Sequence, residues 1–467
     1  MLTPHQYYKR VAFGVTKDND LQNPLEDSIK QLANTNSVSW NHTNPTNLDA
    51  IKYGVNLKYI ENDVSEKGGN DKDRMKAFKE AGILIDPQIE YLPFRAHNAI
   101  HGPSPVLDRF QFFWGNHMPV HGKAVDAVAD TYHRKIIRDS LSGSFNDLVK
   151  NTVTSEAMMR YLDNVDNIDP DSTYSKKHPS QKVGFNENLA REVMELFTIS
   201  TSAGYTQKDV VNATKILSGW GGDRKWMKKK WSRIGDMYFP IVFREDSHTK
   251  GVKTVLGKKY EGGEKELFEF IDDLCAMDEC AQFISTKLAI HYIADNPPKE
   301  SIEHIKSTFK KSSGHLPSIH QATLEAVSKY GEAHQKVSWP EIWLIQAMNI
   351  FDFRLYPLDP ANNDQDPLSC EQYRTLLEKI GNNPLDHGQP NGYPDLAEDW
   401  LSSELLDRRI IIAIKIQEMT KNMMDKNLLE NVSFAMPDSQ ALKELASSEM
   451  DPNALVKILC HRDFIRI

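Results

Sequence analysis

The sequence predicts a mainly α protein, a large globular array of many helices with a small β-hairpin insertion near residues 237–257. Three observations predict this class. Most segments with a clear hydrophobic period have the helical one, and a single segment has the composition of a hairpin. The chain of 467 residues is 40% hydrophobic and 26% charged, which is the balance of a globular protein with a sizeable core.

Apolar residues recur at helical spacing along most of the chain. In "VLDRFQFFWGNHMPV", an aromatic stripe runs along Phe110, Phe113 and Trp114. His117 continues this stripe at helical spacing, so it points where the aromatic rings point. Further helices are expected over 131–142, 144–162, 186–200, 206–218, 264–277, 279–293, 300–312, 317–329, 340–352, 368–380, 396–424, 439–447 and 452–463.

The segment "MYFPIVFREDSHTKGVKTVLG" interrupts the helical pattern. Its β-branched and aromatic residues surround a turn that contains glycine, which is typical of a short hairpin. Other stretches are rich in Asn, Asp, Pro, Gly and Ser and are expected to be irregular. They lie at about 15–50, 163–184, 353–367 and 381–395.

Charge and composition exclude several classes of protein. A formal charge of -9 gives no global attraction to phosphate backbones, so no nucleic acid partner is expected. The basic run "RKWMKKKW" at 224–231 leaves two interpretations open: a solvated loop, which is favoured, and a surface that binds an anionic polymer or envelope component. No stretch approaches the roughly 18 to 20 apolar residues that span a bilayer.

Motifs for several common activities are missing from the sequence. It has no GxSxG, GxxxxGK[ST], GxGxxG or HExxH, which gives no support to a serine hydrolase, a nucleotide-binding protein or a zincin. The four cysteines have no CxxC spacing. The first residues lack the apolar region of a secretory signal. The cytoplasm is therefore the default location, with the periplasm or the extracellular space if the chain is the mature form of an exported protein.

The segment "FNENLAREVMELF" at 185–197 concentrates polar residues on one side of a predicted helix. At positions i, i+3, i+4 and i+7 stand Asn188, Arg191, Glu192 and Glu195. The face is either solvated, with Arg191 and Glu195 as a weak surface pair, or it is a site. A buried His117 would need a polar partner, and the carboxylate of Glu192 or Glu195 would serve.

Three interpretations of such a cluster stay open. His117, Glu192 and Glu195 are a ligand set for Fe, Mn or Zn in a helical bundle. Alternatively, Arg191 holds one carboxylate ionised or binds an anionic substrate group, while the other Glu and His117 form an acid/base pair. In a non-catalytic binding or assembly protein, the same residues would form a buried structural network that fixes helix packing.

Further polar and aromatic residues near these motifs are candidates for substrate binding. Asn186 and Asn188 form an unusually amide-rich helix start, in which one Asn suffices as the cap. Trp220 in "SGW" either closes a helix or stacks on substrate, and His248 is expected in the hairpin turn. The candidates for substrate binding are Asn116, Asn186, Asn188, Trp220 and His248.

Several blocks of the chain resemble, in order, those of the large bacterial DUF1800 family. They are "YYKRVAFG", "FFWGNHMPV", "LVKNTVTSEAMMRYLDN", "NENLAREVMELFT", "YTQKDVVNATKILSGW", "HTKGVKTVLGKKYEGG" and "FISTKLAIHYIADNPP". The later "IFDFRLYPLDP" and "GYPDLAEDWLSSELLDRR" are similar to a diverged version of its C-terminal block. The family commonly has His-Asp where this chain has His248-Thr249.

The resemblance implies a mostly helical protein and a functional link to a DUF1501-type protein, while it names no reaction. It also implies a main domain of DUF1800 type over 1–335, with a C-terminal helical portion over 336–467 packing on it or continuous with it. Our leading hypothesis is an enzyme with a polar His/Glu/Arg site that acts on a polar or anionic substrate, with or without a metal.

Overall fold

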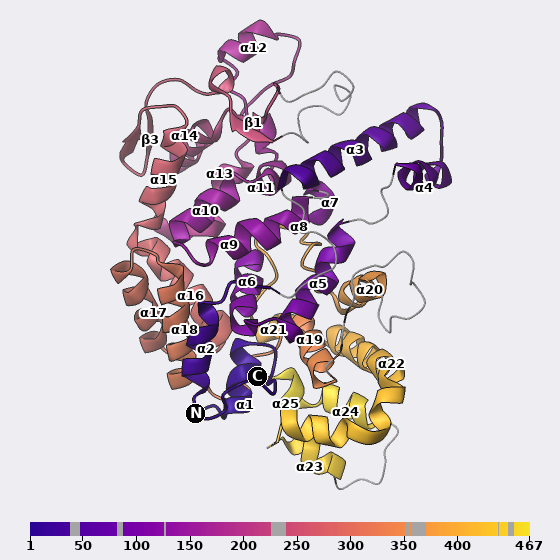
Figure 1. Cartoon of the computed structure of the whole chain (residues 1–467). Coiled ribbons are helices and arrows are strands. Elements are labelled where there is room, and N and C mark those ends of the chain that lie inside the picture. Colours follow the sequence, from indigo (N-terminus) through magenta and orange to yellow (C-terminus); the bar gives the residue numbers. More distant parts are fainter. Residues whose placement is uncertain are drawn as a thin grey trace.

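The computed structural model describes residues 1–37, 47–81, 87–125, 128–225, 240–351, 353, 355, 370–437, 439–446 and 453–467. Helices dominate these residues, and the strands among them form two small two-stranded sheets (Figure 1). The prediction of a mainly α fold with a small β element is therefore confirmed.

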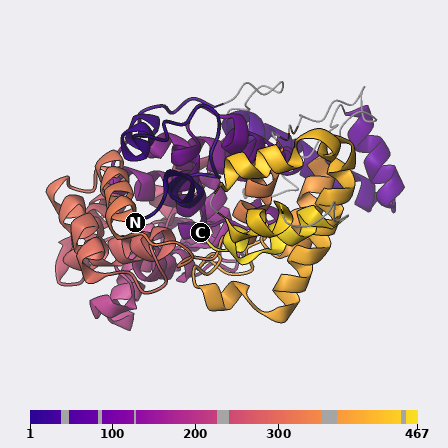
Figure 2. The same ribbon diagram turned by 90° about the horizontal axis from the view of Figure 1, so that it is seen from below.

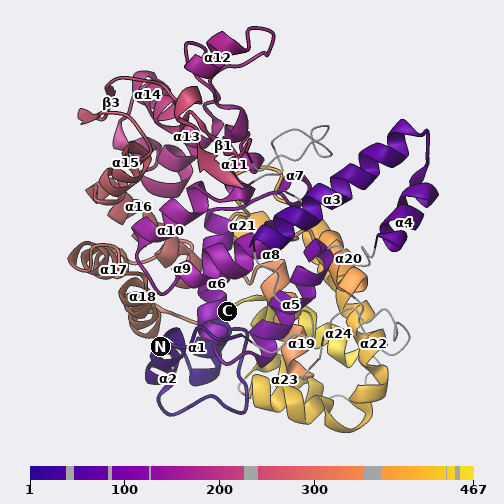
Figure 3. The ribbon, with the colours of Figure 1, turned by 45° about the horizontal axis from the view of Figure 1, so that its top comes forward.

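The N-terminal part of the chain surrounds helix α6, which lies in the middle of the molecule (Figures 1 and 3). Every residue of α6 from Val106 to His117 is buried, because neighbouring helices cover it on all sides. The elements of this part are α1 (Pro4–Val11), α2 (Pro24–Leu32), α3 (Asn47–Glu66), α4 (Asp71–Glu80), α5 (Pro87–His101), α6 (Pro105–His117), α7 (Gly122–Val125), α8 (Val128–Thr131), the π-helix η1 (Tyr132–Ile137) and α9 (Arg138–Ser140).

The middle of the chain carries the helix with the predicted polar face. That helix begins as α13 and continues as the π-helix η3. The helical elements of this part are α10 (Phe145–Val153), α11 (Glu156–Tyr161), η2 (Asn164–Asp166), α12 (Thr173–Lys177), α13 (Asn188–Glu192), η3 (Val193–Thr198), η4 (Thr201–Ala203), α14 (Gln207–Leu217) and η6 (Glu245–Ser247).

The strands pair differently from a single hairpin over 237–257. Strand β1 (Trp220–Gly222) pairs antiparallel with β2 (Ile241–Phe243), and β3 (Lys253–Val255) pairs antiparallel with β4 (Lys258–Tyr260). Leu256 and Gly257 join β3 to β4, and both have a positive φ, of 49° and 80°. Such a two-residue turn matches the twist of a tight hairpin, so β3 pairs forward along the chain and not back with β2.

The C-terminal half of the chain completes the array. Its helices are α15 (Lys265–Cys275), α16 (Asp278–Tyr292), α17 (Lys299–Lys311), α18 (Leu316–Tyr330), α19 (Pro340–Ile350), α20 (Cys370–Ile380), α21 (Ala397–Trp400), α22 (Ser403–Ala435), α23 (Gln440–Ala446), α24 (Ala454–Cys460) and α25 (Arg462–Ile465). Figure 2 shows the indigo N-terminal helices beside the yellow C-terminal ones. Lys9 joins them, since its ammonium donates to the carbonyls of Asp463 and Arg466. The boundary expected near residue 335 stays a prediction.

Local capping explains where the observed helices differ from the expected ones. The helix expected over 144–162 is divided because Ser155 accepts a hydrogen bond from the backbone N–H of Met158 and starts a new helix. Ser402 likewise starts α22 within the range 396–424. The prediction of an irregular stretch over 15–50 was wrong for α2, since Pro24 at its first turn favours a helix start there.

Candidate functional site

The helix with the polar face is anchored by its apolar side. Leu189, Val193 and Phe197 are fully buried. At its start, the Asn186 side-chain oxygen accepts a hydrogen bond from the Asn188 backbone N–H at 2.9 Å. At its end, the chain widens into η3, and the Thr198 hydroxyl donates to the Val193 carbonyl at 2.6 Å. Single π-turns of this kind are often found at functional sites.

Arg191 organises the half-buried polar face. Its guanidinium lies 2.8 Å from a Glu187 oxygen and 3.3 Å from a Glu195 oxygen, each one helical turn away. It also donates to the side-chain oxygen of Gln207 on α14, at 2.7 Å. The Tyr205 hydroxyl is hydrogen-bonded to Glu195. Arg191 therefore has three partners within the protein, and its position is fixed.

Glu192 differs from its neighbours on this face. It is half-buried, and no described residue makes a hydrogen bond or an ion pair with its carboxyl group. Burial raises the pKa of the Glu192 carboxyl to about 7; the nearby Glu195 carboxylate adds to this rise, and Arg191 opposes it. Burial also raises the pKa of Tyr161 to about 12, and the Glu192 carboxylate contributes.

His117 meets the same helix at a different point. Its Nε2–H donates to the Phe197 carbonyl at 3.0 Å, and its Nδ1 has no hydrogen-bond partner among the described residues. The Phe197 carbonyl is one of those at a helix end that lack an intrahelical partner, so His117 satisfies it. Burial lowers the pKa of His117 well below its usual value, and this keeps the imidazole neutral.

The structure does not join His117 to the carboxylates. In the described parts of the chain, no hydrogen bond or ion pair links it to Glu192 or Glu195. The described residues also hold no group of three or more His, Cys, Asp or Glu side chains placed to share a metal ion. The described residues therefore give no support to a ligand set of His117, Glu192 and Glu195.

The substrate-binding candidates occupy several separate places. The Asn188 side chain is exposed on the polar face, next to Arg191. Asn186 lies in the turn before α13. The Asn116 side chain is held by the Tyr393 backbone, donating to its carbonyl at 2.9 Å and accepting from its N–H at 2.7 Å. Only Asn188 is thus both on the polar face and accessible.

Trp220 and His248 belong to a buried region beside the strands. The Trp220 ring packs against Phe243 and Phe268 and is 5% exposed. His248 Nε2 lies 2.8 Å from an oxygen of Glu266, and the Lys253 ammonium lies 2.7 Å from the same oxygen. All three members of this cluster are buried. The cluster is closed to a large substrate, and it ties β3 to α15.

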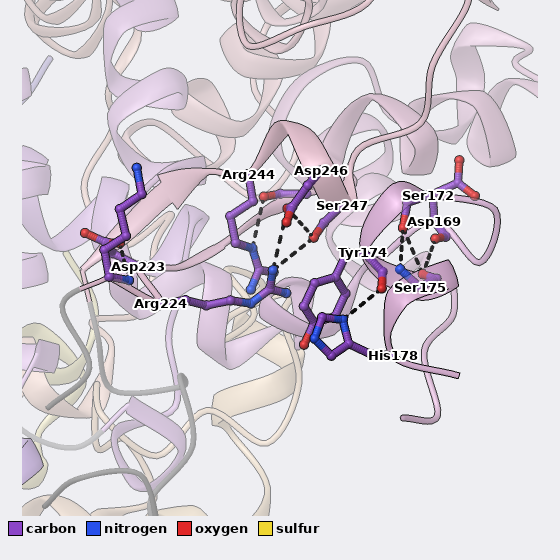
Figure 4. A network of polar contacts seen from close by, with 12 residues as sticks. Asp169, Ser172, Tyr174, Ser175, His178, Asp223, Arg224, Arg244, Asp246 and Ser247 are labelled. Atoms are coloured by element: carbon purple, nitrogen blue, oxygen red, sulfur yellow. Dashed lines mark hydrogen bonds and ion pairs between the residues drawn. The ribbon is translucent and has the colours of Figure 1, made fainter. Parts of the chain in front are cut away.

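Figure 4 shows a polar network at the edge of the expected irregular stretch 163–184. The Arg224 guanidinium stacks 3.5 Å from the centre of the Tyr174 ring in α12, and His178, directly after α12, also stacks on that ring. Arg224 also lies 3.6 Å from Asp246 and donates to the Ser247 hydroxyl at 3.3 Å. The first cation of the basic run is therefore paired with an acid, while residues 226–231 of that run lie outside the described residues.

Sequence reasoning missed a buried charged chain between α6, α16 and the segment before α21. The Arg109 guanidinium lies 2.6 Å from His291 Nε2, and His291 Nδ1 lies 2.5 Å from an oxygen of Asp395. Burial lowers the pKa of His291 to about 4, although Asp395 opposes this change. The available signal was that His291 and Asp395 each stand in a block that carries the family resemblance.

These features define a mainly α protein that presents a half-buried acidic helix face beside a core crossed by buried ion pairs. The chain belongs to the DUF1800 family: the family model described as "Protein of unknown function (DUF1800)" matches residues 6–463. No curated protein and no solved structure was found to match it. Among the described helices, none is both long and apolar enough to cross a membrane.

Proposed function

We propose that the chain is an enzyme that moves a proton to or from a polar substrate, with the Glu192 carboxyl as its acid/base group. A carboxyl with a pKa near 7 is present in both protonation states at neutral pH, so it can take up and return a proton during a reaction. The observation that supports this proposal is the pKa of about 7 at a half-buried Glu192 that no described residue holds by a hydrogen bond. Strongly shifted pKa values are concentrated at functional sites.

The neighbours of Glu192 give it this property and limit its substrate. Arg191 is shared by Glu187 and Glu195, so it is not available to bind a substrate anion. Three carboxyl groups, of Glu187, Glu192 and Glu195, share this face with one guanidinium, so the face has an excess of negative charge. We propose a neutral or cationic polar substrate, which narrows the polar or anionic class expected from the sequence. Asn188, exposed beside this face, is the proposed contact to the substrate.

Of the other three expected catalytic residues, Arg191 and His117 have positioning roles in this proposal. Arg191 holds Glu195 beside Glu192; the Glu195 carboxylate helps to raise the pKa of Glu192, while the charge of Arg191 itself lowers it. His117 holds the end of the helix through the Phe197 carbonyl. A metal-assisted reaction would need His117, Glu192 and Glu195 to share one ion, and it is not part of this proposal because the described residues do not place these three side chains together.

The first experiment measures the titration of Glu192 in the full chain by carboxyl-carbon NMR, with Glu192→Gln to assign the signal. We expect a midpoint near 7. Wild type and Glu192→Gln are then incubated with a pool of polar metabolites, and the consumed compound is identified by mass spectrometry. We expect turnover whose pH profile has an apparent pKa near 7 and which falls by about a hundredfold or more in Glu192→Gln.

The matched control is Glu404→Gln, which removes an exposed carboxylate from α22 that pairs only with Arg408 among the described residues. This variant should retain full turnover. A Glu192 midpoint near 4.5, or unchanged turnover in Glu192→Gln, would refute the proposal.

One observation favours a second candidate function, a binding or assembly protein that performs no reaction. His117 connects α6 to the end of η3 through a buried hydrogen bond, as expected for a network that fixes helix packing. In that case Glu192→Ala would destabilise the protein as strongly as His117→Ala, and no metabolite would be consumed. The link to a DUF1501-type protein implied by the resemblance stays a prediction.

A further inference from the structure

A cavity of about 820 Å³ lies where the N-terminal and C-terminal segments meet. Its walls come from the end of α1 and the loop after it, from α2, from the end of α5, from α19 and from the end of α22. Figure 2 shows these N-terminal and C-terminal elements beside one another. The cavity shares no residue with the face of Glu192, and the following inference is independent of the proposed function.

Uncharged polar side chains stand among apolar ones on the cavity wall. Its carboxamides come from four different elements: Asn19, Gln31, Gln346, Asn349 and Asn431. The charged lining residues balance one another, since Lys9 and Lys17 face Asp18 and Asp27. Three phenyl rings complete the lining, from Phe351, Phe434 and Phe464. The wall therefore offers donors, acceptors and apolar faces without an excess of charge.

Several of these polar groups keep an unused hydrogen-bonding position. Asp27 uses one carboxylate oxygen to accept from the Tyr8 hydroxyl at 2.6 Å and from Gln31 at 3.0 Å, and no described group donates to its other oxygen. The Asn349 amide nitrogen donates to the Phe13 carbonyl at 3.0 Å, while its oxygen accepts from none of the described residues.

Lys9 brings a buried donor to the cavity. Its ammonium donates to two backbone carbonyls of the C-terminal segment and lies 5.1 Å from the Phe464 ring. An ammonium has three N–H groups, so one is left beyond the two that the described carbonyls accept. Burial lowers the pKa of Lys9 to about 7, which weakens its preference for an anion over a hydroxyl group.

The fold builds one wall of the cavity by a close approach of two segments. Gly14 has a φ of +97°, and a Cβ at this position would lie 3.3 Å from the Asn349 amide nitrogen. Glycine therefore allows the loop after α1 to lie against α19. This part of the cavity wall is therefore set by the packing of the loop after α1 on α19.

We propose that this cavity binds a neutral, polyhydroxylated small molecule, of the class of mono- and disaccharides. Hydroxyl groups donate and accept at once, so they fit a wall that carries both functions in its carboxamides and in the Asp27 oxygen to which no described group donates. The phenyl rings match the apolar C–H faces of a sugar ring. An anionic ligand fits poorly because Asp27 stands in the same wall as Lys9.

Isothermal titration calorimetry of the full chain tests the proposal, with glucose, sucrose and trehalose as neutral probes and inorganic phosphate and citrate as charged ones. We expect saturable binding of at least one sugar. Ala435→Trp places an indole in the cavity from the end of α22 and should weaken that binding by about tenfold or more. Asn431→Leu removes an amide for which the described residues supply no hydrogen bond, and it should weaken binding less.

Ile411→Trp is the matched control, because Ile411 is 59% exposed on the same helix and does not line the cavity. Its affinity for the sugar should equal that of the wild type. Thermal unfolding of each variant without ligand verifies that it is folded. The proposal is overturned if none of the sugars binds saturably or if sugar binding survives Ala435→Trp. It is also overturned if phosphate or citrate binds to the wild type and Ala435→Trp removes that binding.

Discussion

Two polar side chains lie at the helix formed by α13 and η3, and they differ in their hydrogen bonding: His117, at the end of α6, and Glu192, in α13 itself. His117 is 2% exposed and gives its N–H to a backbone carbonyl. Glu192 is half-buried and has no hydrogen-bond partner among the described residues. A buried polar group without a hydrogen-bond partner costs free energy, so a fully buried side chain such as His117 is normally hydrogen-bonded to the protein around it. Glu192 is not bound in this way, and its carboxyl remains available for chemistry.

The same contrast separates the core from the surface elsewhere in the molecule. The Arg95 guanidinium makes two hydrogen bonds with Glu341, at 2.9 and 2.8 Å, and both side chains are buried. Arg109, His291 and Asp395 are likewise connected by hydrogen bonds inside the molecule. In contrast, Arg408 and Glu404 form an ion pair on an exposed helix surface. Removing one partner should have very different consequences in these two settings.

The largest effect is expected from Glu341→Ala. Without its carboxylate, Arg95 would remain as an uncompensated charge in the core, and such losses cost about 3 to 5 kcal/mol in the free energy of unfolding. Urea denaturation at pH 7 measures this change. Glu404→Ala, the exposed counterpart, should change the free energy of unfolding by about 0.5 kcal/mol or less. Equal losses in the two variants would contradict the contrast between core and surface pairs.

A smaller effect is expected from His117→Ala. The substitution removes a ring that contacts Phe113, Phe197 and Phe283 and leaves the Phe197 carbonyl without its donor, at a cost of about 2 to 4 kcal/mol. Glu192→Ala should change the free energy of unfolding by about 0.5 kcal/mol or less at pH 6. Urea denaturation compares the two variants directly. A large loss in Glu192→Ala would instead support the structural network.

The sequence predicted the direction of these side chains better than their partners. Helical spacing placed Arg191 and Glu195 on one face, where they form an ion pair at 3.3 Å. It also placed His117 with the buried aromatic residues. Periodicity cannot predict which neighbouring helix a side chain reaches. The partner of His117 is a backbone carbonyl at the end of η3. Every residue has such a carbonyl, so the sequence pattern cannot identify it.

Long-range pairing explains the remaining differences. The chain from Arg109 to Asp395 joins residues that are far apart in sequence, and the local period of any one segment contains no information about it. Strands β1 and β2 likewise pair although a long stretch of sequence separates Gly222 from Ile241. By contrast, the β3–β4 hairpin is local, and Gly257 in "VLGKKY" is a residue suited to the positive φ of its turn.

The smallest effect is the pH dependence that Glu192 adds to stability. Its folded-state pKa of about 7 lies above the unfolded value, so the folded state binds this proton more tightly than the unfolded state does. Stability therefore falls as pH rises from about 4.5 to about 7, and the full penalty remains above that range. Glu192→Gln removes the ionisation and should be more stable than the wild type at pH 8 by about 1 kcal/mol, a value that is reduced by solvent screening at a half-exposed group. The difference should shrink as the pH is lowered toward 4.5.

Urea denaturation of both proteins at pH 8 and pH 5 measures this difference, with Glu404→Gln as the exposed control that should show none. A Glu192→Gln variant that is less stable than the wild type at both pH values would mean that the Glu192 carboxylate stabilises the helix, which is a structural role. A variant that gains stability at pH 8 while losing turnover would have the signature of a functional group kept at the expense of folding free energy. That combination would separate a catalytic face from a structural one without any knowledge of the substrate.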